Sequence, residues 1–210
     1  MILRSHQRIS DNTLIYVDID IKEDIILKHI LLTSTGFTNK NLEKLFLENV
    51  GRPANEVRVI FIPTAAIDDE SRSTIPECRK DLLDAGVPEA NIVDYDLDRQ
   101  MSQEEISTFD AVYFCGGSET HLIEAVNKAG FAEILKKAVN DGLFYIGVSA
   151  GSMIASSSVN DGLYFIPNAL EPHCEENITP DGPLPCKDIP VNISDDQAVW
   201  ITDDGACILS

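Results

Sequence analysis

Residues 144–155 read Phe-Tyr-Ile-Gly-Val-Ser-Ala-Gly-Ser-Met-Ile-Ala, and this stretch decides the fold. Its apolar beginning predicts a buried strand, and the residues from Ser152 onward predict the start of a helix. Gly147 and Gly151 allow the helix to approach the strand closely, as a sharp strand-to-helix turn requires. Ser149 then lies on the turn, near the positive end of the helix. We therefore expect an exposed serine hydroxyl on an elbow at the edge of a sheet.

The same pattern has a purely structural interpretation. A glycine-rich turn can simply pack a helix on a sheet, with Ser149 as the N-cap of that helix. Gly-x-Ser-x-Gly alone is a weak signal, because glycine and serine are common residues. The strand before the turn and the helix after it favour the nucleophile, since both are what the elbow requires.

Outward from the elbow, apolar strand-like runs alternate with helix-like segments along the chain. The expected strands are 29–32, 57–62, 92–95, 111–115 and 143–147, and the expected helices are 39–49, 74–85 and 119–140 with a break at Gly130. Short β-like stretches follow at 163–166, 191–193, 198–202 and 207–209. This alternation predicts an α/β three-layer sandwich with a mostly parallel central sheet, and the tail predicts a short antiparallel C-terminal edge.

Length and composition are those of one globular domain. The chain has 210 residues, of which 44% are hydrophobic and 24% charged. We expect the α/β domain over residues 28–210 and an N-terminal extension over residues 1–27. Apolar and polar residues alternate over 13–27, which fits an edge strand, a hairpin or a partner-binding arm.

Charge and cysteine usage exclude several classes of partner. Acidic residues number 35 against 16 basic ones, giving a formal net charge of −19. This field repels nucleic acid and anionic lipid, so neither is an expected partner. No apolar run reaches the roughly 20 residues of a membrane span, and no signal peptide is evident. Five scattered cysteines without a CxxC spacing indicate reduced thiols in a cytoplasmic protein.

A nucleophilic serine needs a base, and four histidines are available. His173 follows Ser149 in chain order and lies in a Pro-containing loop after a strand, so it is the favoured general base. Between the two residues, Asp161 and Glu171 are the acidic side chains that could orient the base. Asp161 also fits an ordinary Asn-Asp-Gly turn.

Two further patterns near the expected site have alternative interpretations. His173, Cys174, Glu175 and Cys186 could hold a metal, but their spacing matches no common zinc pattern, so we expect neither metal nor cofactor. Gly116 and Gly117 form a second glycine turn, after the strand 111–115, and a backbone amide there could help to hold an oxyanion. A phosphate site at this turn is disfavoured because the GxGxxG pattern and a P-loop lysine are missing.

These residues resemble the serine peptidase family of dipeptidase E and cyanophycinase, relatives of the class I glutamine amidotransferase fold. The resemblance rests on the opening strand 29–34, Gly116-Gly117, the elbow 147–152 and Pro172-His173. It implies Ser149 as nucleophile and His173 as base, with Asp161 in the position of the triad acid. It also implies oxyanion donors at the Gly117 and Ala150 amides, and a small peptide as substrate.

The chain departs from the family pattern in ways that bear on function. The segment between Ser149 and His173 is short, the glycine loop continues with Ser118-Glu119-Thr120, and no arginine follows Arg99. The arginine that reads aspartyl substrates in dipeptidase E therefore has no counterpart here. We expect a serine peptidase of small peptides; a binding protein that keeps the fold and an amidotransferase-like domain are the alternatives. A homodimer is left open.

Overall fold

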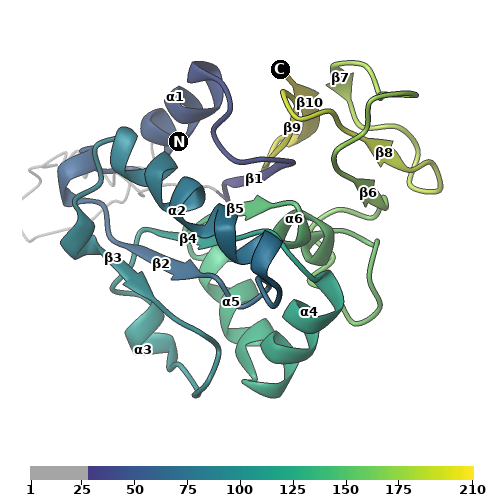
Figure 1. The fold of residues 1–210 in the computed structure, drawn as a ribbon. Coiled ribbons are helices and arrows are strands. Elements are labelled where there is room, and N and C mark those ends of the chain that lie inside the picture. Colours follow the sequence, from purple (N-terminus) through teal and green to yellow (C-terminus); the bar gives the residue numbers. More distant parts are fainter. Residues whose placement is uncertain (1–27) are drawn as a thin grey trace, which may run out of the picture.

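The computed structural model describes residues 28–210, so the expected extension over residues 1–27 lies outside the described part (Figure 1). In this part a central sheet has the strand order β3-β2-β4-β5-β1-β9-β10-β7. The parallel strands are β1 (Ile30–Thr33), β2 (Val59–Ile62), β3 (Ile92–Asp94), β4 (Ala111–Phe114) and β5 (Phe144–Val148). The antiparallel strands are β7 (Gly182–Pro183), β9 (Ala198–Thr202) and β10 (Gly205–Leu209). The mostly parallel sheet with an antiparallel C-terminal edge is therefore confirmed.

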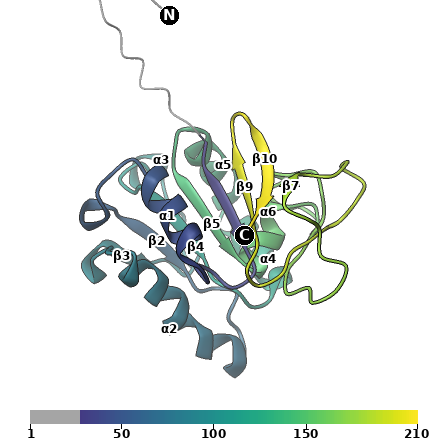
Figure 2. The same cartoon turned by 90° about the horizontal axis from the view of Figure 1, so that it is seen from above.

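Helices cover both faces of this sheet (Figures 1 and 2). One face carries α1 (Lys40–Asn49) and α2 (Asp69–Asp84), and the other carries α4 (Glu119–Lys128), α5 (Phe131–Asn140) and α6 (Ala150–Ala155). The short helices are α3 (Gln103–Ile106), η1 (Ala54–Glu56) and η2 (Glu89–Asn91). Successive residues of a strand point to opposite faces. Ile30 and Leu32 accordingly pack with one core cluster, and Leu31 packs with the other.

The chain differs from the expected elements at two places. Helix α2 begins at Asp69 rather than at Thr74, because Asp68 caps it by accepting a hydrogen bond from the Ser71 amide at 2.8 Å. The expected strand over 163–166 is absent from the described chain. This segment instead packs against the end of α6, where the Leu163 amide donates to the Ile154 carbonyl at 2.7 Å.

A small second sheet also departs from the expected antiparallel edge. It consists of β6 (Leu170–Glu171) and β8 (Val191–Asn192), and the two strands run parallel. None of the helices within residues 28–210 is both long and apolar enough to cross a bilayer.

Close packing at the start of α6 explains the glycines of the elbow. A Cβ on Gly151 would lie 2.6 Å from the Phe114 Cβ, and one on Gly147 would lie 2.7 Å from the Gly151 carbonyl oxygen. Both distances are below van der Waals contact, so neither position tolerates a side chain without a shift of backbone. The turn between β5 and α6 is thus fixed by the core beneath it.

We expect Gly151→Ala to lower the free energy of unfolding by about 1–3 kcal/mol, the usual effect of overpacking a core. Urea denaturation of the wild-type and variant proteins measures this loss. Ser157→Ala is the control, because this serine is exposed near the end of the same helix and should change stability by less than about 0.5 kcal/mol. Equal stabilities of the Gly151→Ala and Ser157→Ala variants would contradict the packing argument.

Candidate active site

Ser149 occupies a strained backbone position between β5 and α6. Its φ is 47° and its ψ −104°, which a non-glycine residue adopts only where its surroundings hold it. The Ser149 amide donates to the Thr33 carbonyl at 3.0 Å, and the Ser149 carbonyl accepts from the amides of Ser152 and Met153. The side chain makes no capping hydrogen bond to the helix. The hydroxyl is therefore not used as the N-cap group that the structural interpretation required.

The hydroxyl instead contacts a histidine that is itself held by a carboxylate. Ser149 Oγ lies 2.9 Å from His173 Nε2, and His173 Nδ1 lies 2.8 Å from Asp195 Oδ1. A carboxylate at Nδ1 places the ring proton there, so Nε2 is left to accept a hydrogen bond from the serine hydroxyl. The three side chains form a continuous Ser-His-Asp chain. The side chains of His173 and Asp195 are 48% and 59% exposed, so this chain opens to solvent.

The small parallel sheet explains how His173 and Asp195 meet. Leu170 pairs with Val191 and Glu171 pairs with Asn192, so β6 and β8 end at the same edge. His173 comes two residues after the end of β6, and Asp195 three residues after the end of β8. Parallel strands bring the residues that follow them together at one edge.

The loop after β1 fixes both of these segments. The Ser34 hydroxyl accepts from the His173 amide at 3.1 Å and donates to the Ser194 carbonyl at 3.0 Å. The hydroxyls of Thr35 and Thr38 both donate to the Asp195 carbonyl, at 3.2 and 3.0 Å. Ser34 is buried and thus links the histidine and the aspartate to the same point of the sheet.

Asp161, the expected acid, lies elsewhere. It has a positive φ of 57° in the turn after α6, its carbonyl accepts from Asn127 Nδ2 at 3.3 Å, and it lines a different cavity from Ser149. Glu171 makes no side-chain hydrogen bond within residues 28–210. The carboxylate in contact with His173 is therefore that of Asp195 and not that of Asp161, the expected acid. Reasoning from the sequence missed Asp195 because it considered only acids between the serine and the histidine.

The Gly116-Gly117 turn lies directly beside Ser149. A Cβ on Gly116 would lie 3.3 Å from the Ser149 Cβ. Gly117 has a φ of 136°, and a Cβ there would lie 2.1 Å from the Ala65 carbonyl oxygen, which accepts from the Ser118 amide at 2.8 Å. Close packing on Ala65 thus fixes the position of the Gly117 amide. Ala150 is the first residue of α6 and follows Ser149 directly.

Ser149 and His173 open into a cavity of about 460 Å³, whose other wall is one face of α2. Burial raises the pKa of Asp81 in this wall, although its carboxylate accepts from the Tyr113 hydroxyl at 2.7 Å and the Phe37 amide at 3.0 Å. Burial also raises the pKa of Tyr113 well above its usual range. Within residues 28–210 no group of three or more His, Cys, Asp or Glu side chains is placed to hold a metal ion.

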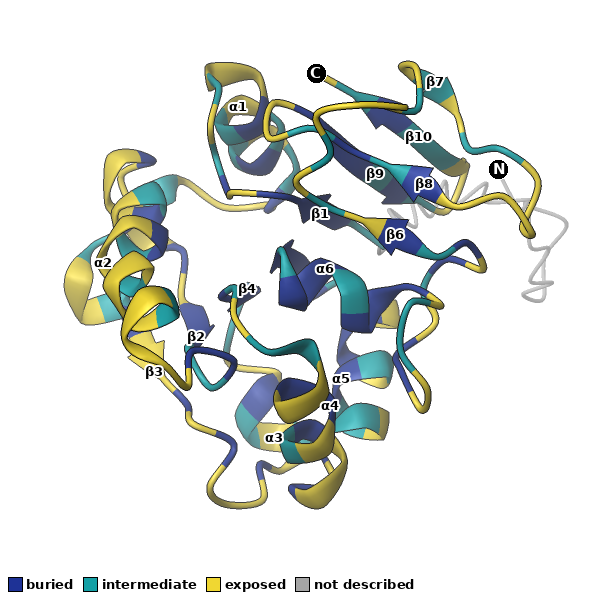
Figure 3. Cartoon of the chain, turned by 45° about the vertical axis from the view of Figure 1, so that its right-hand side comes forward, coloured by how far each residue is buried: buried dark blue, intermediate teal, exposed yellow. Residues whose placement is uncertain are grey.

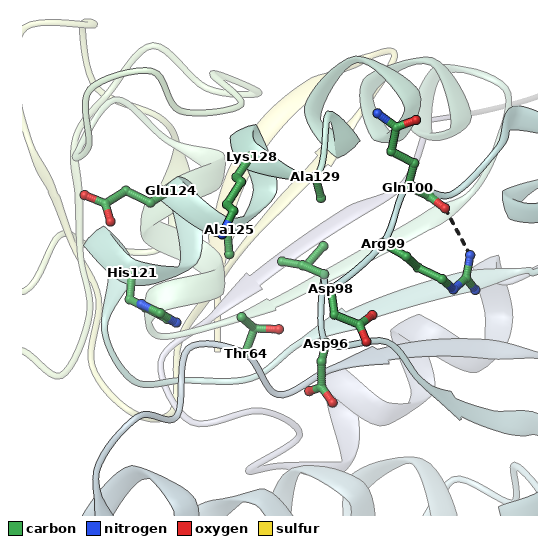
Figure 4. Close-up of a pocket in the computed structure, with 11 residues that line it drawn as sticks. Thr64, Asp96, Asp98, Arg99, Gln100, His121, Glu124, Ala125, Lys128 and Ala129 are labelled. Carbon is green, nitrogen blue, oxygen red and sulfur yellow. Dashed lines mark hydrogen bonds between the residues drawn. The ribbon is translucent and has the colours of Figure 1, made fainter.

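A second cavity, of about 510 Å³, lies between α4 and the segment after β3. Figure 4 shows His121 and Lys128 on its helical side and Asp96 and Asp98 on the opposite side. His121 thus lines this cavity and not the one that contains Ser149.

The chain is similar in sequence to known peptidases. Residues 30–164 match the model of peptidase family S51. The chain is 30% identical over 115 residues to an uncharacterized peptidase of Pasteurella multocida, and 32% identical over 132 residues to the peptidase E of Streptomyces coelicolor. These alignments cover 53% and 63% of this chain, and 54% and 46% of the relatives. The aligned part thus spans about half the length of these curated relatives.

Solved structures show the same fold. A protein from Listeria monocytogenes EGD-e that is assigned as a peptidase E superposes with a TM-score of 0.66 at 24% identity, covering 88% of this chain and all of that one. A peptidase from an acI-B1 Actinobacterium superposes with a TM-score of 0.62 at 14% identity, covering 88% of each chain.

Ser34→Ala should lower the free energy of unfolding by about 1–3 kcal/mol, because it removes the partner of the His173 amide and of the Ser194 carbonyl. Urea denaturation measures the loss, and amide hydrogen exchange should rise in residues 170–174 and 193–196. Ser107→Ala is the matched control, since that hydroxyl bonds only within its own helix region at the surface. Unchanged exchange in the two segments would argue against a linking role for Ser34.

Proposed function

Because the chain belongs to peptidase family S51, we propose that it is a serine peptidase of the dipeptidase E type that hydrolyses short peptides. The observation that carries this proposal is the hydrogen-bonded chain from Ser149 through His173 to Asp195, on a strained elbow beside a glycine turn. The proposal also includes three points: the substrates are peptides, the location is cytoplasmic, and residues 28–210 form the α/β peptidase domain. A homodimer remains a prediction from the sequence.

In the proposed mechanism Ser149 Oγ attacks the peptide carbonyl carbon as His173 Nε2 takes the hydroxyl proton. Asp195 keeps the ring oriented and stabilises the positive charge that forms on it. The amides of Gly117 and Ala150 donate hydrogen bonds to the developing oxyanion. His173 then gives its proton to the leaving amine, and an acyl-enzyme ester remains on Ser149.

Water completes the cycle. His173 takes a proton from a water molecule that attacks the ester carbonyl, and the tetrahedral intermediate collapses to release the acid and restore the serine hydroxyl. The open position of His173 supports this step, because bulk water reaches a half-exposed ring without a conformational change.

Ser149→Ala should abolish the hydrolysis of a dipeptide panel, with a fall in kcat of roughly 10³–10⁶-fold, because no other group can form the acyl-enzyme. A fluorophosphonate should label the wild-type protein once, at Ser149, and should leave the variant unlabelled. Mass spectrometry of the intact chain measures the labelling. A wild-type protein that is neither labelled nor active would favour the binding-protein alternative.

Asp195→Asn should lower kcat by roughly 10- to 1,000-fold, less than for a buried triad acid, because Asp195 is more than half exposed. Asp161→Asn removes the same charge at the position expected from the sequence and should leave kcat within about twofold of wild type. Steady-state kinetics on one peptide compares the two variants. The reverse ranking would return the role of triad acid to Asp161.

A further inference from the structure

The wall of the cavity opposite the nucleophile carries carboxylates on one face of α2. Glu70, Thr74, Glu77 and Asp81 follow one another at intervals of three or four residues, so they share a face of the helix. Asp68 adds a fourth carboxylate at the N-cap. Ser149 and His173 line the same cavity from the other side.

Within residues 28–210, no lysine or arginine lines this cavity beside the carboxylates. Among the residues of the described chain that line this cavity, His173 is the only one of basic type, and its ring is engaged by Ser149 and Asp195. The cations of α2 form their ion pairs outside the cavity: Arg72 pairs with Asp69, Arg79 with Glu89 and Asp94, and Lys80 with Asp84. Arg72 also acts on Asp68 and Lys80 on Asp81, but neither cation pairs with Glu70 or Glu77. A substrate in the cavity therefore meets a negative field at these two glutamates.

Two of the four carboxylates, Asp68 and Asp81, have structural roles. The other two, Glu70 and Glu77, are free to contact a ligand. The Ser71 amide and hydroxyl hold the pKa of Asp68 below its usual range, as part of the helix cap. Asp81 accepts hydrogen bonds from Tyr113 and Phe37 at the back of the cavity. Within residues 28–210, Glu70 and Glu77 are exposed and make neither a side-chain hydrogen bond nor an ion pair.

We propose that the substrate carries a cationic group next to the scissile bond, either the α-ammonium of the peptide or a Lys or Arg side chain, and that Glu70 and Glu77 select it. This inference rests on the proposed function, because it assigns the substrate class of the same site. It distinguishes this chain from an enzyme that recognises aspartyl substrates. An aspartyl carboxylate in this cavity would face like charges and, among the described residues that line it, neither lysine nor arginine. Carboxylates that line a cleft raise the local concentration of a cationic substrate and lower that of an anionic one.

The test uses tripeptides of one sequence in which a single residue on either side of the scissile bond is Lys, Nε-acetyl-lysine or Glu. Each peptide is made with a free and with an acetylated N-terminus. Acetyl-lysine keeps the chain length and removes the charge, and the terminal acetyl group separates the α-ammonium from the side chain as the source of recognition. We measure kcat/KM at low and at high salt, and the protection of Ser149 from a fluorophosphonate by each peptide.

We expect cationic peptides to be preferred, with Glu peptides the poorest, and the preference to weaken at high salt because the carboxylates are exposed. Glu70→Gln and Glu77→Gln should each reduce the preference roughly two- to fivefold, the range typical of exposed ion pairs. The control is the double variant Glu104→Gln/Glu124→Gln, which removes as much charge outside this cavity as the Glu70→Gln/Glu77→Gln double variant removes within it. It should keep the full preference.

The outcomes distinguish this inference from the proposed function. Labelling of Ser149 and hydrolysis without any charge preference would overturn the inference and leave the peptidase proposal standing. An equal loss of preference in the two double variants would assign the effect to the net charge of the whole chain, and so overturn the role of Glu70 and Glu77. Absence of both labelling and hydrolysis would overturn the proposed function and the inference with it.

Discussion

The contact between the start of α6 and the ends of β4 and β5 is the constraint on which the site depends. Gly151 lies so close to Phe114 that a Cβ on Gly151 would be 2.6 Å from the Phe114 Cβ. This close contact leaves little room for the turn between β5 and α6. Ser149 takes the positive φ of that turn, and a strained residue persists only where its surroundings over-determine it. The position of the Ser149 hydroxyl on this turn is thus a consequence of core packing.

The candidate site has two parts that the chain builds in different ways. Ser149 and the Gly116-Gly117 turn follow β5 and β4 of the large sheet, and both strands are buried along their whole length. Figure 3 colours the chain by burial. His173 and Asp195 follow the two short strands of the second sheet. The match to the family model ends at residue 164, so it includes Ser149 but neither His173 nor Asp195. The partners are joined to the serine by the loop after β1, through the Ser34 hydroxyl.

Local patterns made the first part predictable. A strand, a glycine-flanked serine and a helix are adjacent in sequence, so the elbow at Ser149 could be foreseen, as could the glycine turn. The strand expected before His173, over 163–166, is absent from the described chain, and His173 follows β6 instead. Asp195 could not be foreseen, because its place depends on the pairing of β6 with β8. The stretch expected at 191–193 contains β8, but β6 has only two residues, too few for alternation to reveal it, and the parallel pairing of the two strands cannot be read from the sequence.

The carboxylates of α2 that line the cavity could also not be fully predicted from the sequence. Its first turn, with Glu70, lies before the start expected for the helix, because apolar periodicity gives no sign of it. The helix begins there because Asp68 and Ser71 exchange hydrogen bonds in a capping box. This capping box is a local polar interaction. Long-range packing decides on which side of the sheet the helix lies, and therefore which residues it faces.

The contacts that hold the segments of His173 and Asp195 have a consequence for the local stability of the site. The bonds from Ser34, Thr35 and Thr38 to residues 173 and 194–195 are side-chain-to-backbone contacts, each of them worth on the order of 0.5–1.5 kcal/mol net. The strand that carries Ser149 is instead buried throughout its length. Parts of a protein open with free energies that range from near zero to that of global unfolding. Leu170, Val191 and Ile193 are buried in the core, so the loops that carry His173 and Asp195, and not the small sheet as a whole, have the weaker attachment. An opening confined to these loops would leave the sheet folded and would separate Ser149 from His173.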